Sequence, residues 1–249
     1  MITTSRKTSS KPVGDAPGAS WNPLFRIGGI SALAISVLFL AEMTIYLVSR
    51  APSLADTAGW FTLFHEHRFI GLLDFGILEL YGSVLFVPVF AALYHYFREK
   101  HEGLMLIATF LAITGIAANF ATSKMFPLLT LSDLYASATT EALRAQYLVL
   151  GRSVLALGAL GGISGTPEGG IPLAFAGLLV SWAMLRRGRP WKAAAIAGLF
   201  ANIAAHGMYI YDAVVPTPEG SPFFIFFFVF SIAWFVLIGL GLIRLAKRG

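Results

Sequence analysis

Long apolar stretches alternate with short polar connections along most of this chain. A helix needs about 20 apolar residues to cross the hydrocarbon core of a bilayer, and six stretches reach or approach that length. The pattern therefore predicts an all-α fold, a polytopic transmembrane helix bundle with six spans. The predicted spans cover residues 24–48, 69–97, 104–125, 171–185, 191–211 and 223–243.

A further apolar segment, residues 147–163, raises the alternative of seven spans, and the distribution of charge decides between the two. Seven spans would put the basic loop 186–192 and the basic C-terminus on the side opposite the basic N-terminal tail. With six spans, the tail, the loop with Arg98 and Lys100, the loop 186–192 and the C-terminus lie on one side. The loops on the other side hold Asp56, Asp133, Glu141, Glu168, Asp212 and Glu219. Cationic loops favour the cytoplasmic side, so we predict six spans with both termini in the cytoplasm.

The extra segment is then expected to form a helix, at about residues 139–160, that does not cross the bilayer. Glu141 falls in its first turn, where an acidic side chain is favourable. The glycine-rich stretch 161–170 that follows is not expected to continue a helix. We predict an outer helix that lies along the interface or re-enters from it, and the sequence leaves these two alternatives open.

Composition supports a membrane environment. Hydrophobic residues make up 57% of the 249 residues and charged residues 12%, against roughly 25% charged in soluble domains. Residues 1–22 are rich in Ser, Thr, Lys, Pro and Gly, which predicts a disordered basic cytoplasmic tail. Residues 23–249 are expected to form a single transmembrane helical domain in the cell (plasma) membrane, with the lipid bilayer as its partner.

The net charge of +5 does not indicate a nucleic-acid partner, because the basic residues lie at membrane flanks. The chain has no cysteine, which excludes disulfides and thiolate metal sites. The basic flanks are Arg6, Lys7 and Lys11 in the tail, Arg98 and Lys100, the group Arg186, Arg187, Arg189 and Lys192, and Arg244, Lys247 and Arg248 at the C-terminus.

Burial of an ionisable side chain inside a membrane span costs free energy, so each such residue needs a structural or functional explanation. At a rise of about 1.5 Å per residue, four polar side chains from four predicted spans fall at one depth, roughly 10 Å below the outer surface. They predict a polar pocket open to the outer side, which would bind a proton or a cation. The alternative is that each makes one interhelical hydrogen bond and only fixes packing. The four residues are Glu42, Asp74, Asn119 and His206.

Glu79 is placed deeper by the same count, roughly 18 Å from the outer end of span two. It lies five positions after Asp74, so the two carboxylates are not expected to share a helical face. Glu79 is included as a candidate ligand residue, and the sequence does not name its partner.

Signatures of several enzyme classes are missing. The chain has no His-Glu-x-x-His, Gly-x-Ser-x-Gly or Walker motif. His65 and His67 lie two positions apart and would diverge on a helix, so they do not predict a zinc site. We assign no catalytic residue, no metal and no cofactor.

Asp74 in the second span is followed by Ala-Ala-Leu-Tyr at 91–94, and the Gly-Thr-Pro-Glu-Gly-Gly segment at 165–170 leads into Leu-Leu-Val-Ser-Trp-Ala-Met-Leu-Arg at 178–186. With an outer helix before span four, this pattern resembles a bacterial family of small six-span integral membrane proteins with a domain of unknown function. The resemblance covers residues 24 to 245. It implies six spans and carries no established activity, so no functional residue is transferred from it.

Three functions are compatible with these features. The first is a small transporter or sensor-like binder that uses the outer polar pocket. The second is a structural or accessory subunit that binds other membrane proteins through small residues such as Gly28, Gly29, Gly158 and Gly162. The third is a membrane-embedded enzyme acting on lipid or quinone, for which the sequence supplies no nucleophile.

Overall fold

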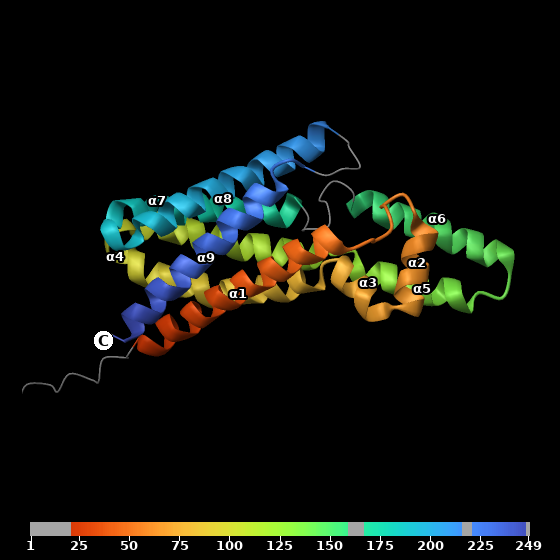
Figure 1. Cartoon of the computed structure of the whole chain (residues 1–249), viewed down its shortest axis with the longest axis horizontal. Coiled ribbons are helices and arrows are strands. Elements are labelled where there is room, and N and C mark those ends of the chain that lie inside the picture. Colours follow the sequence, from red (N-terminus) through yellow and green to blue (C-terminus); the bar gives the residue numbers. More distant parts are fainter. Residues whose placement is uncertain (1–20, 159–166, 216–220, 248–249) are drawn as a thin grey trace, which may run out of the picture.

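The computed structural model describes residues 21–158, 167–215 and 221–247, and within these ranges all regular secondary structure is helical (Figure 1). This confirms the predicted all-α bundle. The helices are α1 (Asn22–Val48), α2 (Thr57–Glu66), α3 (Arg68–Asp74), α4 (Ile77–Thr122), α5 (Met125–Ser137), α6 (Glu141–Gly158), α7 (Pro167–Arg187), α8 (Arg189–Val214) and α9 (Phe224–Ala246).

Helix α4 is a hairpin of two antiparallel legs. His101 breaks the helical backbone with φ −140° and ψ 44°. Eighteen residues before and after it, Ser83 and Asn119 meet through a 2.9 Å hydrogen bond from the Asn119 amide to the Ser83 hydroxyl. In a straight helix these residues would lie about 54 Å apart, so the chain reverses at His101.

Five helical stretches in the described ranges are long and apolar enough to cross a membrane. One of them, Ile77–Ser137, contains both legs of α4 and the short helix α5. The hairpin divides this stretch, so the five stretches contain six long legs. The outward faces of the legs carry exposed apolar side chains, such as Val37, Phe110, Ile203 and Phe226, as contact with lipid requires.

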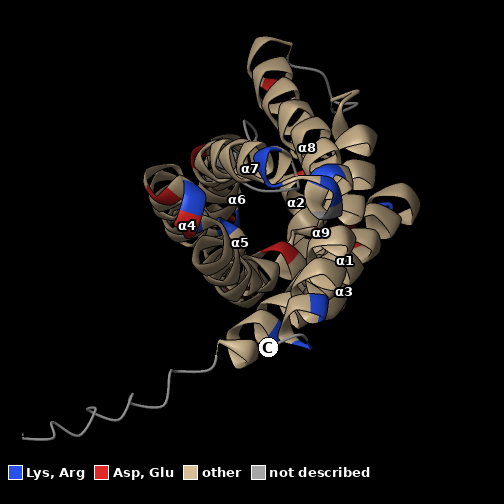
Figure 2. Cartoon of the chain, turned by 90° about the vertical axis from the view of Figure 1, so that its left-hand side faces the viewer, with Lys and Arg blue, Asp and Glu red and all other residues tan. Residues whose placement is uncertain are grey.

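The six legs form a ring in which α1 packs on α9 and α4, α7 on α4 and α8, and α8 on α9 (Figure 2). Glycines permit the closest approaches, because a missing Cβ lets two helix backbones meet. A Cβ on Gly115 of α4 would lie 2.6 Å from the Gly169 carbonyl oxygen of α7. The reciprocal Cβ on Gly169 would lie 2.9 Å from the Gly115 carbonyl oxygen.

One end of the bundle gathers the basic connections. The ring of Trp21, before α1, stacks on His95 of α4 at 4.0 Å between centroids, and Tyr96 lies 5.4 Å from Trp191 of α8. The Arg187 guanidinium, at the end of α7, lies over Tyr96 and 3.4 Å from the Glu99 carboxylate. Figure 2 looks onto this end and shows Lys and Arg on several helix ends.

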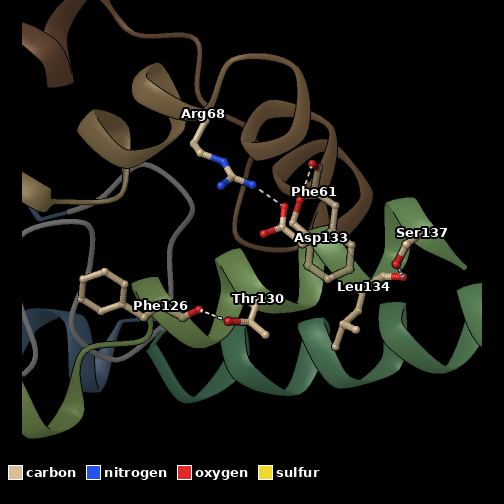
Figure 3. A network of polar contacts seen from close by, with 8 residues as sticks. Phe61, Arg68, Phe126, Thr130, Asp133, Leu134 and Ser137 are labelled. Carbon is tan, nitrogen blue, oxygen red and sulfur yellow. Dashed lines mark hydrogen bonds and ion pairs between the residues drawn. The ribbon is translucent and has the colours of Figure 1, made fainter.

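The opposite end carries a cap made of α2, α3, α5 and α6 (Figure 1). Its apolar core consists of Trp60, Phe61, Phe64, Leu128 and Leu155. Two polar contacts join its helices: the Ser132 hydroxyl donates to the Phe61 carbonyl at 2.8 Å, and Arg68 pairs with Asp133 (Figure 3).

Helix α6 is the outer helix that the sequence predicts before span four. It packs on α5 and α2 within the cap, and both predicted alternatives, an interfacial and a re-entrant helix, stay predictions. Its described bounds, Glu141–Gly158, fall inside the predicted range 139–160.

Several predicted boundaries differ from the structure. Span two was expected to begin at residue 69, but Gly76 adopts φ 96° and separates α3 from α4. Residues 167–170 were expected to be non-helical, but they form the first turn of α7, where Pro167 and Glu168 both favour a helix N-terminus. Span three ends at Thr122, not residue 125. Residues 1–20 of the predicted tail and residues 159–166 lie outside the described residues.

The contact between α4 and α7 gives a test of the fold. Gly115→Ala should lower the free energy of unfolding by about 1–3 kcal/mol, because overpacking at a rigid backbone exceeds the gain in helix propensity. Gly103→Ala is the matched control on the same helix, since a Cβ there meets nothing within 4 Å. Thermal unfolding in detergent measures both. Equal midpoints for the two variants would contradict the close packing.

Candidate functional site

A cavity of about 80 Å³ lies inside the bundle, in the half nearer the cap, and each of the six legs contributes to its wall. We call it the central cavity. Its polar lining residues are Glu42 of α1, Glu79 and Ser83 of the first leg of α4, Asn119 of the second leg, Asn202 and Tyr209 of α8, and Ser231 of α9. The rest of the wall is mainly aromatic and aliphatic, with Phe39, Phe86, Phe90, Phe227, Phe228, Trp234 and Phe235 among its residues.

Glu79 is held in place by the α4 hairpin. The Asn119 amide nitrogen lies 3.4 Å from a Glu79 carboxylate oxygen and also donates to the Ser83 hydroxyl. Ser83 in turn donates to the backbone carbonyl of Glu79 at 2.9 Å. Glu79 falls in the first turn of its helix, where the helix dipole favours a negative charge. The partner that the sequence did not name is therefore Asn119.

Glu42 approaches the same cavity from α1 and interacts electrostatically with Glu79. None of the described residues that line the central cavity is Lys, Arg or His. A buried carboxylate without a counter-charge is costly in a low-dielectric interior and is normally neutralised or paired. No described lining residue therefore supplies a positive charge to the pair.

Two glycines of α7 make room for polar side chains of α8. A Cβ on Gly170 would overlap the Tyr209 hydroxyl, and a Cβ on Gly177 would overlap the Asn202 carboxamide. The Asn202 amide donates to the Gly198 carbonyl at 2.6 Å. These small residues therefore allow Tyr209 and Asn202 to reach the cavity while α7 and α8 stay packed.

The structure brings together three of the five residues that the sequence selected: Glu42, Glu79 and Asn119. Asp74 lies in a neighbouring cavity of about 150 Å³, which Glu42 also lines. His206 is absent from the lining of both. Its Nδ1 lies 2.7 Å from the Asn202 carbonyl oxygen, and its ring packs edge-on against Phe175 at 4.4 Å.

The predicted depth of Glu79 rested on a helix that the structure divides between Asp74 and Ile77. The estimate counted one continuous helix from residue 67, but α4 begins at Ile77, so Glu79 lies in the first turn of its leg. Sequence reasoning also missed Ser83, Asn202, Tyr209 and Ser231. Helical spacing gave a signal for two of them, because Ser83 follows Glu79 by four residues and Tyr209 follows Asn202 by seven.

No group of three or more His, Asp or Glu side chains in the described ranges is arranged to hold a metal ion. His65 and Glu66 lie on α2 in the cap, and His67 follows them between α2 and α3.

The bond across the α4 hairpin can be tested by substitution. Asn119→Ala should lower the free energy of unfolding by about 0.6 kcal/mol, the average for hydrogen bonds between membrane helices, and by no more than about 1.7 kcal/mol, the maximum. A double-mutant cycle with Ser83→Ala should give a favourable coupling energy. Ser36→Ala is the control, since that hydroxyl bonds only the Ala32 carbonyl of its own helix. Additive effects of Asn119→Ala and Ser83→Ala would count against the bond.

No protein-family model, no curated protein sequence and no solved structure matches this chain. The comparisons neither support nor contradict the resemblance to bacterial six-span membrane proteins, which stays a prediction.

Proposed function

We propose that this protein is a small membrane transporter or sensor-like binder that takes a proton or a small cation into the central cavity. The observation that carries the proposal is the carboxylate pair of Glu42 and Glu79 in one cavity whose described lining contains no basic side chain. A positive charge bound there would remove the repulsion between the two carboxylates and the cost of their burial.

The size of the cavity limits the ligand. Binding sites for drug-sized molecules enclose about 300–1,000 Å³, whereas the central cavity encloses about 80 Å³. One water molecule needs roughly 10–15 Å³ measured in this way, so there is room for a few water-sized groups. The proton, a partly hydrated alkali cation and an ammonium-sized organic cation all fit, and the aromatic walls suit a cation over a ring face.

The proposed orientation follows the charges. We place the basic end of the bundle in the cytoplasm, with both termini, and the cap outside the cell membrane, as positive-inside topology requires. The central cavity then lies in the outer half of the membrane. The accessory-subunit and enzyme alternatives stay predictions, because no contact in the site favours either of them.

Infrared spectroscopy of the purified protein tests the proposal. When pH is raised, or when sodium or methylammonium chloride is added at fixed pH, the carbonyl band of protonated carboxyl groups should decrease. Glu42→Gln and Glu79→Gln should each weaken this response, and the double variant should abolish it. Glu141→Gln is the control, because that carboxylate is exposed on α6 and pairs only with Arg144.

One outcome of the infrared measurement would contradict the proposal. A response that is the same in the double variant and in the unsubstituted protein would show that other carboxyl groups bind the proton or cation, and would reject the proposal.

A further inference from the structure

We infer that cations reach the central cavity from the cap end through two further cavities, guided by the carboxylates of Asp74 and Glu42. The inference extends the proposed function and rests on it for the nature of the ligand. The path itself rests on a separate observation, the lining residues that successive cavities share.

The outermost of the three cavities encloses about 370 Å³ between the end of α1 and the helices α2 and α3. The middle cavity, about 150 Å³, is formed by α1, the α3–α4 junction and the start of α9. The two cavities share four lining residues, which therefore form their common boundary. These are Ile45, Ser49, Leu73 and Asp74.

Asp74 is the charged group at this boundary. Asp74 is 6% exposed, and its carboxylate makes no hydrogen bond or ion pair with another described residue. An acidic side chain without a protein partner at the boundary of two cavities is placed to attract a passing cation. The chain brings Asp74 there because α3 ends at this residue and Gly76, which also lines the middle cavity, turns the backbone with φ 96°.

Glu42 and Phe228 form the boundary between the middle and central cavities, because both residues line both spaces. Phe228 is 1% exposed and packs against Phe224 at 4.6 Å and Phe39 at 5.6 Å between centroids. A cation that passes this ring meets Glu42 first and then Glu79. Each step inward thus offers one carboxylate, in the order Asp74, Glu42 and Glu79.

Arg50 is the one basic residue among the described linings of the three cavities, and it lines only the outermost. It is solvent-exposed, where counter-ions screen its charge. The two inner cavities contain carboxylates without any basic lining residue. The electrostatic potential in the two inner cavities therefore favours cations over anions.

The absence of cysteine from the chain makes thiol labelling a direct test. Ser49→Cys reports on the outer two cavities and Ser231→Cys on the central cavity. Each single-cysteine protein, shown to be monodisperse in detergent, is labelled with a cationic or an anionic methanethiosulfonate. We expect the ratio of cationic to anionic labelling rates at Ser231→Cys to be about tenfold higher than the same ratio for a small free thiol, as electrostatic focusing in an acidic path predicts. Ala205→Cys, also in the central cavity, serves as a second reporter.

Two substitutions locate the path. Adding Asp74→Asn should reduce the cationic rate at Ser231→Cys severalfold, whereas Asp133→Asn, on the cap surface, should not change it. Phe228→Ala should accelerate labelling of Ser231→Cys and leave Ser49→Cys unchanged.

Labelling of Ser49→Cys with none at either central reporter would overturn the inference, as would a rate ratio equal to that of the free thiol or no effect of Asp74→Asn. These outcomes are separable from failure of the proposed function. An intact infrared response of Glu42 and Glu79 together with a closed path would mean that the same cation site is reached from elsewhere.

Discussion

The reversal of α4 at His101 fixes the register between two neighbouring legs, and most of the site geometry depends on that register. Because Ser83 and Asn119 are equally distant from the turn, they meet at the same depth, and the Asn119 amide then bridges Ser83 and Glu79. The same register places Gly115 against Gly169, which draws α7 onto α4 and closes one side of the central cavity. A shift of one residue would turn the Asn119 side chain by about 100° around its helix and remove both contacts.

Burial of Glu42 and Glu79 is the costly feature of the fold, and the surrounding residues reduce its cost in specific ways. The first turn of α4 and the Asn119 amide stabilise the Glu79 carboxylate. No comparable hydrogen bond involves Glu42 among the described residues. The walls are large aromatic groups, which exclude bulk water and keep the space small. The proposed positive charge would offset the cost of an acid pair in such a cavity, whereas helix packing needs only one amide or hydroxyl.

The sequence carries enough information for the six legs and for part of the site. The lengths of the apolar stretches, with the positions of the arginines and lysines, give the number of legs. The basic connections between legs gather at one end of the bundle, as that charge pattern requires. Equal depth brought Glu42 and Asn119 together correctly. The break at Gly76 could not be predicted, because residues 69–97 form an almost continuous apolar run and a single glycine is tolerated in many helices. The predicted depth of a residue does not specify the face of the helix on which its side chain lies. It therefore could not show that His206 faces Phe175 while Asn202 and Tyr209 face the cavity.

The geometry of the central cavity depends most on the contact by which Asn119 holds Glu79 across the α4 hairpin, next to Glu42. Solid-state NMR tests it most directly, through the dipolar coupling between asparagine side-chain ¹⁵N and glutamate carboxyl ¹³C in the membrane-embedded protein. The chain has only three asparagines, Asn22, Asn119 and Asn202, so the spectrum is simple to assign. We expect one resolved coupling, matching the 3.4 Å contact between nitrogen and oxygen, that disappears in Glu79→Gln. A spectrum without that coupling, or one in which it survives Glu79→Gln, would show that Asn119 does not hold Glu79.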